Sequence, residues 1–410
     1  ALAAKDYFLL QGPPGTGKTS AMLANMVGHI FHQTEENIFL LAFTNRAVDE
    51  ICKKIEPICK GQMIRLGSGK EGSPYSLSHL TKDKKIKEVH QILSQTRIFV
   101  STVASFYKNL NLFKIKTFDT VIVDEASQLL EPHLSGVLPR FKRFILIGDE
   151  KQLPAVVTQD AEKCLTQQTD LHDMGIRDLS ISMFERLLTN AQNRDWHSCY
   201  AMLTTQFRMH GDITQFVNDH FYKKLKIGTE RQTLPLQHPP SPASGELADW
   251  INQSRLLFWD SPLEHQNKIN HTEAQRVVRL LQVIRDMYQQ DFKADTVGII
   301  TPYRAQIAQI YGQLDEELQN KVSIDTVERY QGSEREIVII SMAVNHPEQL
   351  KNLQAFNAQQ TVDKKLNVAL TRAREQVILL GNEQVLKEGK FYKKLIEYMK
   401  TNSQANEKLF

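Results

Sequence analysis

The feature that most constrains this chain is a glycine-rich octapeptide near its start, between an apolar run at residues 7–10 and a helical pattern at residues 20–29. In such a turn, glycines let backbone N–H groups wrap around phosphate oxygens, and the following helix N-terminus adds a favourable dipole. Lys18 can reach the β- and γ-phosphates of a nucleotide, and the Thr19 hydroxyl can bind magnesium. A chance glycine-rich turn would not require the strand and the helix on either side, so the octapeptide predicts a P-loop. Its residues are Gly12, Pro13, Pro14, Gly15, Thr16, Gly17, Lys18 and Thr19.

Short apolar runs recur along the chain, and helical patterns fill the segments between them. Near-continuous apolar strands that alternate with helices indicate parallel sheets covered on both faces, so we expect an α/β fold. The expected strands are residues 7–10, 38–43, 98–101, 120–123 and 144–147 in the first half, and 200–203, 256–259, 296–300, 336–341 and 377–380 in the second.

A polar stretch at residues 190–198 separates the two series of strands and predicts two domains, residues 1–195 and 196–410. A polar, lysine-rich segment at about 67–96 is expected to form a small helical insertion in the first domain. Its lysines could touch phosphates, but a solvated helix face is the preferred interpretation. The tail after about residue 400 is expected to be flexible.

Composition excludes several classes of protein. Apolar residues make up 41% of the 410 residues and charged residues 24%, as in an ordinary globular protein. The net charge of +3 neither requires nor excludes nucleic acid as a partner, because a local basic groove can coexist with it. No apolar run spans a membrane and no signal peptide is present, so we expect a cytoplasmic protein, or a nuclear one in a eukaryote. The four cysteines form no CxxC pair and predict free thiols.

A P-loop needs a second carboxylate site at the end of a neighbouring strand, and Asp124-Glu125 follows the apolar run 120–123. We expect Asp124 to hold Mg²⁺ and Glu125 to polarise the attacking water as the general base for hydrolysis of ATP. Another apolar run is followed by the loop 148–154, in which Gln152 can hydrogen-bond the γ-phosphate.

The second half has no P-loop but contains two arginines that suit a catalytic role. Arg208 lies within Gln-Phe-Arg-Met-His at residues 206–210, and Arg372 lies within Asn-Val-Ala-Leu-Thr-Arg-Ala-Arg at residues 367–374. An arginine that projects from one domain towards a γ-phosphate held by another stabilises the charge of the transition state. Either arginine alone would more often be a surface salt-bridge residue.

Seven segments resemble, in order, the motifs of superfamily 1 helicases, and they span nearly the whole chain. They read GPPGTGKT, DEASQ, GDEKQLP, QFRMH, GIITPYRAQ, DTVERYQGSERE and NVALTRAR. The pattern is similar to superfamily 1B, in the branch of the nonsense-mediated-decay RNA helicase, senataxin and the Okazaki-flap nuclease-helicase. Its finer details favour the last of these. The resemblance implies tandem RecA-like domains and ATP-driven movement 5′ to 3′ along a single strand, with DNA as the favoured substrate.

The same resemblance implies further site residues. Phe207 should stack on adenine, and Glu334 should lie near the ribose. Hydroxyls, amides and backbone groups suit strand contacts that are made and released at each step without reading base identity. The implied strand contacts are Thr44, Asn45, Ser101, Thr102, Thr301, Tyr303 and Thr326.

The chain departs from the family pattern at its start, since relatives carry an adenine-reading glutamine segment and a small β-barrel upstream. We therefore expect a fragment of a longer protein, with its own upstream domains as partners and a monomeric motor. Alternatives are an RNA helicase of the same branch or a nucleotide-gated clamp that binds a strand without unwinding. A metabolic P-loop kinase is disfavoured because it would not need the motifs of the second half.

Overall fold

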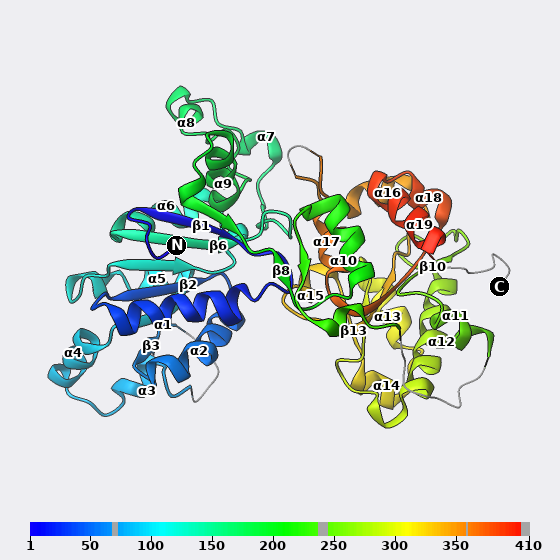
Figure 1. Cartoon of the computed structure of the whole chain (residues 1–410), viewed down its shortest axis with the longest axis horizontal. Coiled ribbons are helices and arrows are strands. Elements are labelled where there is room, and N and C mark those ends of the chain that lie inside the picture. The colour runs from blue at the N-terminus through cyan, green and yellow to red at the C-terminus, as the bar shows by residue number, and fades with distance from the viewer. Residues whose placement is uncertain (68–72, 237–244, 358–359, 403–410) are drawn as a thin grey trace. The chain divides into compact units, whose positions relative to one another are not determined.

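The computed structural model describes residues 1–67, 73–236, 245–357 and 360–402. The chain divides into two compact units. The first consists of Ala1–Glu150 with Pro154–Leu203, and the second of Lys151–Leu153 with Thr204–Phe410. Figure 1 shows that each unit is built around its own sheet.

The first unit contains a seven-stranded sheet in the order β3-β4-β2-β5-β6-β1-β7, in which every neighbouring pair is parallel. Because the strands run the same way, their carboxyl ends meet at one edge, where parallel α/β sheets place their ligands. The strands are β1 (Tyr7–Gln11), β2 (Ile38–Ala42), β3 (Met63–Arg65), β4 (Ile98–Thr102), β5 (Thr120–Val123), β6 (Arg143–Gly148) and β7 (Tyr200–Met202).

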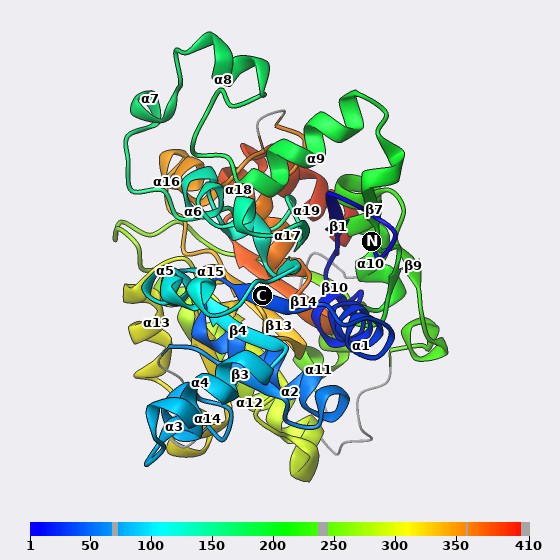
Figure 2. The ribbon, with the colours of Figure 1, turned by 90° about the vertical axis from the view of Figure 1, so that its left-hand side faces the viewer.

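Helices cover both faces of this sheet, because alternate residues of each strand enter different cores. Phe8 and Leu10 pack in the core that α1 and α2 close, whereas Leu9 packs in the core that α5 and α9 close. Figure 2 shows α2 and α5 on opposite sides of β4. The helices of the first unit are α1 (Ala24–Gln33), α2 (Asn45–Cys59), α3 (Leu77–Thr81), α4 (Ile86–Gln95), α5 (Val103–Lys108), α6 (Glu131–Ser135), α7 (Ala161–Cys164), α8 (Thr169–Asp173) and α9 (Met183–Asn193).

The lysine-rich segment between β3 and β4, where a small helical insertion was expected, contains the two short helices α3 and α4. Residues 68–72, at its start, lie outside the described part of the chain. Ile86 at the start of α4 is exposed, and the lysines beside it leave this end of the helix solvated. At the other end of the chain, the last helix continues to Asn402, and residues 403–410 lie outside the described part.

The second unit contains a five-stranded parallel sheet in the order β10-β14-β13-β11-β12, and a short parallel pair, β8 with β9. The strands are β8 (Thr205–Gln206), β9 (Lys226–Ile227), β10 (Leu256–Asp260), β11 (Val297–Ile300), β12 (Ser323–Asp325), β13 (Arg335–Ser341) and β14 (Ala373–Gly381). The helices are α10 (Gly211–Val217), α11 (Glu246–Ile251), α12 (His271–Tyr288), α13 (Arg304–Tyr311), α14 (Glu316–Lys321), α15 (Val327–Tyr330), α16 (Pro347–Leu353), α17 (Lys364–Leu370), α18 (Glu383–Lys387) and α19 (Lys390–Asn402).

The fold class expected from the sequence is confirmed, since both main sheets are parallel and helices pack on them. One strand is placed differently from the expectation. Residues 200–203 were expected to open the second series, but β7 pairs with β1 in the first sheet. The first unit consequently continues to Leu203, beyond the polar stretch that suggested a boundary at 195. None of the helices in the described segments has the length and hydropathy that a bilayer span requires.

A buried carboxyl group in the second core predicts a pH-dependent stability. Glu273 of α12 is fully buried, and its Oε2 accepts hydrogen bonds from Ser341 Oγ (2.7 Å) and Ala343 N (2.9 Å). Burial raises the pKa of Glu273 from 4.5 to about 7, and these hydrogen bonds offset only part of that effect. The folded protein therefore binds a proton more tightly than the unfolded chain. Its unfolding free energy should fall as the pH rises from about 4.5 through about 7.

Glu273→Gln stays neutral, so we expect it to lose this slope and to be more stable than the parent at pH 8. The gain is at most about 3 kcal/mol, at 1.4 kcal/mol per pKa unit. Urea unfolding followed by fluorescence of Trp250 and Trp259, both in the second core, measures the effect. Glu264→Gln is a control, because the Glu264 carboxyl should change the unfolding free energy with pH in the opposite direction. Hydrogen bonds from His271 N and Thr272 N outweigh burial and lower the pKa of Glu264. Equal slopes for parent and Glu273→Gln would contradict the prediction.

Candidate nucleotide and strand sites

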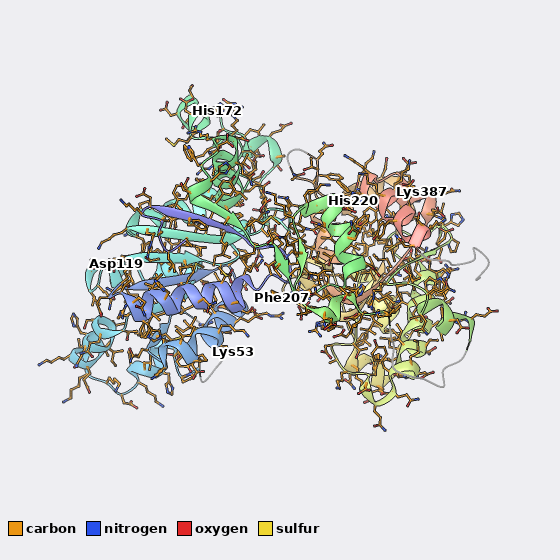
Figure 3. All side chains as sticks on the ribbon, in the orientation of Figure 1. Lys53, Asp119, His172, Phe207, His220 and Lys387 are labelled. Atoms are coloured by element: carbon orange, nitrogen blue, oxygen red, sulfur yellow. The ribbon has the colours of Figure 1, made fainter. Side chains whose placement is uncertain are left out.

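The glycine-rich octapeptide begins where β1 ends, at the carboxyl edge of the first sheet. Gln11 of β1 is in register with Gly148 of β6, and Gly12 N donates to Gly148 O at 2.9 Å. Asp119 precedes β5 and is labelled in Figure 3, so it marks the opposite, amino-terminal edge of the same sheet. The loop therefore lies at the edge where a parallel sheet presents its ligand-binding loops.

The loop closes on itself before the first helix starts. Gly15 and Gly17 have φ values of 75° and 73°, a left-handed conformation that glycine adopts without strain. Thr16 Oγ1 donates to Pro13 O at 2.7 Å. The chain then enters a π-helical turn, Lys18–Leu23, in which Met22 N reaches back to Gly17 O at 3.1 Å before α1 begins. This arrangement leaves a glycine-lined turn at a helix N-terminus, the geometry that binds phosphate.

Gly12→Ala is expected to lower the affinity for ATP by about 10²-fold, because a methyl group there would displace Lys18. An added Cβ would lie 2.7 Å from Lys18 Cβ and 2.9 Å from Lys18 Cδ. Displacements of about 1 Å at a reacting site can cost 10²-fold in rate, and we expect a loss of binding of the same order here. Fluorescent nucleotide titration measures the effect. Gly28→Ala in α1 is the matched control, since its Cβ would meet the end of one flexible side chain, with Ile58 Cγ2 at 3.2 Å and Ile58 Cδ1 at 3.9 Å. Equal ATP affinity in both variants would contradict the prediction.

The carboxylates expected beside the P-loop lie next to it. Thr19 Oγ1 donates to Asp124 Oδ2 at 2.7 Å, and Lys18 Nζ forms an ion pair with Glu125 Oε1 at 3.2 Å. Both acids follow β5, and Glu125 holds a left-handed backbone with φ of 52°. Such strain in a non-glycine residue recurs at functional sites. Asp149, at the end of β6, is fully buried and completes the acidic group around Lys18.

The charges of this site are strongly coupled. Burial, together with the neighbouring Glu125 carboxylate, raises the pKa of Asp124 to about 6. Burial alone would lower the pKa of Lys18, but the Glu125, Asp149 and Asp124 carboxylates outweigh it and raise that pKa. An excess of buried carboxylates over cations is relieved when a divalent cation joins the site. The Thr19 hydroxyl and the Asp124 carboxylate are oxygen donors of the kind that Mg²⁺ prefers, so these residues fit the expected metal.

A second constellation lies within the second unit and contains the two arginines. Arg208 follows β8, and its Nε pairs with Glu334 Oε2 while its Nη1 donates to Thr371 O at 3.1 Å. Within the described residues, Nη2 of Arg208 has no hydrogen-bond partner, so one edge of this guanidinium remains available. Burial would raise the pKa of Glu334, but the Arg208 and Arg374 guanidinium groups lower it and keep the carboxyl ionised.

Arg372 is placed very differently from Arg208, since only 2% of its surface is exposed. It follows α17, and its Nε donates to Val368 O at 3.1 Å. Its Nη2 lies 3.5 Å from Gln152 Oε1. Gln152 belongs to the second unit, because Lys151 O accepts from Asn367 Nδ2 at 2.7 Å. The sequence placed Gln152 within the first domain, whereas the structure groups residues 151–153 with the second unit, where Gln152 lies beside Arg372.

Phe207, expected to stack on adenine, is 52% exposed and is labelled in Figure 3. Its ring is backed by Gly228, where an added Cβ would come within 2.4 Å of two ring atoms. A glycine at residue 228 is therefore required for the ring to lie where it does. Phe207 is adjacent to Arg208, whose partner is Glu334, so the expected adenine, ribose and phosphate contacts of the second unit are neighbours.

The expected strand contacts of the first unit follow two neighbouring strands at the carboxyl edge of the sheet. Thr44 and Asn45 come after β2, and Ser101 and Thr102 end β4. Thr44 and Thr102 cap α2 and α5, accepting from Ala47 N (3.2 Å) and Ser105 N (3.1 Å). The Ser101 side chain is fully buried and its Oγ donates to Thr102 O, so its hydroxyl does not reach a bound strand in this conformation.

The second unit repeats this arrangement on β11 and β12. Thr301 follows β11, Thr326 follows β12, and Thr301 N donates to Asp325 O at 3.1 Å. Tyr303 is half-buried at the N-terminus of α13. The Thr301 hydroxyl is buried and has no partner within the described residues. As with Ser101, a strand contact at Thr301 would have to use its backbone.

Two charged residues in these constellations were not singled out from the sequence. Asp149 follows an apolar strand, as Asp124 does, so the same signal could have identified it. Arg374, by contrast, is recognisable only in the structure. It lies near the start of β14, beside Glu375 and Gln376, and nothing in this local sequence indicates that it contacts Glu334.

Comparison with known families gives two matches described as AAA domains. One model matches residues 179–384, half of the chain, and the other matches residues 1–88 and 77–160. The DNA replication ATP-dependent helicase/nuclease DNA2 of Gallus gallus is 30% identical over 387 residues, which cover 93% of this chain and 35% of that protein. The DNA polymerase alpha-associated DNA helicase A of Saccharomyces cerevisiae is 25% identical over 474 residues, covering 97% of this chain and 66% of that protein.

The parallel sheets and the glycine-rich loop define a P-loop protein of the α/β class. The chain belongs to the AAA domain family and, within it, to the superfamily 1B helicases related to DNA2. It spans 35% of the length of the Gallus gallus relative and 36% of that from Bos taurus. Among solved structures, Arterivirus nonstructural protein 10 (helicase) with DNA is 13% identical with a TM-score of 0.45, covering 96% of this chain and 63% of that one.

Proposed function

We propose that this chain is the ATP-driven motor of a helicase that moves 5′ to 3′ along single-stranded nucleic acid, with DNA as substrate and Mg²⁺ as the metal. The observation that carries the proposal is the Lys18, Thr19, Asp124 and Glu125 cluster at the carboxyl edge of the first sheet. The names of the relatives, which are DNA helicases, favour DNA over RNA.

The residues divide the chemistry of hydrolysis between them. When bound, Mg²⁺ would neutralise charge on the β- and γ-phosphates, held by Thr19 and Asp124. Lys18 would exchange its ion pair with Glu125 for the phosphates. Glu125, released from Lys18, would accept the proton of the attacking water. The free edge of Arg208 would supply a guanidinium for the charge that develops on the transferred phosphoryl group.

The strand would be held by polar residues at the carboxyl ends of β2 and β4 in one unit and of β11 and β12 in the other. Contacts of this kind bind the sugar–phosphate backbone without reading base sequence. Stepping requires that the two groups of contacts move relative to each other as ATP is bound and released. Arg208 and Arg372 are the residues through which we expect the nucleotide to act on the second unit.

The test is the ATPase rate with no polymer, with single-stranded DNA and with RNA of equal length and composition, together with strand displacement from 5′- and 3′-tailed duplexes. We expect strong stimulation by DNA and unwinding only of the 5′-tailed duplex. Greater stimulation by RNA would replace the proposal with an RNA helicase. ATP-dependent strand binding without turnover would replace it with a nucleotide-gated clamp.

A further inference from the structure

A chain of alternating charges runs through the second unit from Arg208 to Glu336. Arg208 pairs with Glu334, and Glu334 pairs in turn with Arg374. Arg374 is also held by Glu336 and Asp295. Arg374 has no role in the proposed chemistry, yet its side chain ties the Glu334 carboxylate to β14.

The contacts of Arg374 fix one oxygen of Glu334. Its Nε and Nη2 both donate to Glu334 Oε1, at 3.0 and 2.7 Å, and its Nη1 donates to Glu336 Oε1 at 2.6 Å. Arg374 and Glu336 lie in adjacent strands, β14 and β13, which are the rigid part of the unit. A planar guanidinium that spans two carboxylates defines the direction of both.

Glu334 itself is not on a regular element. It lies in the turn between α15 and β13, after Gly332, whose φ is 82°. Without Arg374, a partly exposed glutamate in a turn would occupy several rotamers, and ordering it would cost conformational entropy. The other oxygen of Glu334 accepts from Arg208 Nε. The orientation of Arg208 therefore depends on a carboxylate that Arg374 holds in place.

Among the described residues, the Arg208 side chain has few other contacts, although its backbone N donates to Gln206 Oε1 and its O accepts from Arg231 Nη2, both at 2.9 Å. It follows β8, a strand of only two residues, and its remaining side-chain contact is Nη1 with Thr371 O. The backbone of this segment is tied separately, since His210 N donates to Arg374 O at 2.8 Å. A substitution of the Arg374 side chain would leave that backbone bond in place and remove the support of Glu334, together with the ion pairs to Glu336 and Asp295.

We propose that Arg374 is a positioning residue, which acts through Glu334 to present the free edge of Arg208 towards the phosphate of a bound nucleotide. The proposal rests on the proposed function for the role of Arg208. The loss of a residue that orients a metal ligand typically costs about 10–100-fold in activity, and we expect a loss of the same order for a residue that orients Arg208. Because Arg374 contacts neither phosphate nor base, the effect falls on kcat, and KM for ATP changes less than about threefold.

Arg374→Gln is compared with Arg285→Gln, a control chosen for equal exposure. Both side chains are 26% exposed and ion-paired, but Arg285 pairs with Asp315 and has no contact with Glu334. Arg374→Gln should lower kcat about tenfold or more, Arg374→Lys should recover part of that loss, and Arg285→Gln should match the parent. When Arg208 is already replaced by Ala, adding Arg374→Gln should lower kcat no further. A kcat for Arg374→Gln equal to that of Arg285→Gln would overturn the proposal.

A second measurement does not depend on turnover and separates this proposal from the proposed function. The Nε proton of Arg208, bonded to Glu334, should exchange slowly with water in NMR spectra of ¹⁵N-labelled protein. We expect Arg374→Gln to accelerate that exchange and Arg285→Gln to leave it unchanged. If the parent shows no ATP turnover but this acceleration is seen, the proposed function fails while the positioning of Arg208 stands. Unchanged exchange in Arg374→Gln overturns the positioning role, whatever the turnover.

Discussion

Glu125→Gln is expected to abolish ATP turnover while leaving ATP binding intact. The amide keeps the size and the hydrogen-bonding shape of the carboxylate but cannot accept the proton of the attacking water. Glu125 directly follows β5 and has a left-handed backbone conformation. Its side chain forms an ion pair with Lys18 at 3.2 Å. Loss of that ion pair frees Lys18 for the phosphates, so ATP affinity should stay equal or rise.

Single-turnover hydrolysis and nucleotide titration measure the two effects separately. Lys18→Ala should instead lower the affinity for ATP in the binding assay, because it removes the cation that contacts the phosphates. Glu36→Gln is the matched control, since Glu36 is a similarly exposed carboxylate just before β2, ion-paired with Arg143 at 2.8 Å at the opposite edge of the sheet. If Glu125→Gln hydrolysed ATP at the parental rate, another residue would have to be the base.

The sequence predicted strands such as β5, which is apolar along its length, but missed two short strands at the edges of the sheets, β3 and β12. β5 occupies residues 120–123 as expected, because all four of its residues are buried. β3 and β12, each of three residues, lie at the ends of their sheets. In β12, Ser323, Ile324 and Asp325 are only partly buried, so the segment lacks the apolar run by which a buried strand is recognised.

The sequence also could not assign a strand to a sheet. β7 follows the polar stretch that suggested the domain boundary, yet Leu9 pairs with Tyr200 in the first sheet. Such a pairing joins residues far apart in the sequence, and no local pattern encodes it. The placement of Gln152 with the second unit depends in the same way on distant contacts, above all the bond from Asn367 to Lys151 O.

The candidate site was more predictable in the first unit than in the second. The P-loop, Asp124 and Glu125 each follow an apolar strand, and parallel strands bring their carboxyl ends together. Burial of individual side chains was not predictable. Ser101 and Thr301 were expected to contact a strand through a hydroxyl or the backbone, and both side chains are fully buried. Residue type alone does not say which face of the backbone a hydroxyl occupies.

Arg208→Ala and Arg372→Ala are each expected to lower ATP turnover about 10³-fold, the typical effect of removing an arginine that stabilises the phosphoryl transition state. Strand binding without nucleotide should remain nearly intact, because neither arginine is among the expected strand contacts. The two variants should differ in stability. Arg208 keeps one edge free, whereas Arg372 is buried and donates to Val368 O and Gln152. Loss of the Arg372 side chain leaves a cavity and buried acceptors without their donor, which costs a few kcal/mol.

Strand affinity without nucleotide, strand-stimulated turnover and thermal unfolding should be measured on the same preparation of each variant. Arg208→Ala should unfold at nearly the parental temperature, so its loss of turnover reports on chemistry alone. Arg372→Ala should unfold at a lower temperature, and Arg372→Lys tests the chemical role with less of a cavity. Because lysine cannot reproduce the fork of contacts made by Arg372, Arg372→Lys should regain stability but little turnover. If Arg208→Ala, folded as the parent is, retained turnover within a few-fold, the proposed action of the nucleotide on the second unit would have to be abandoned.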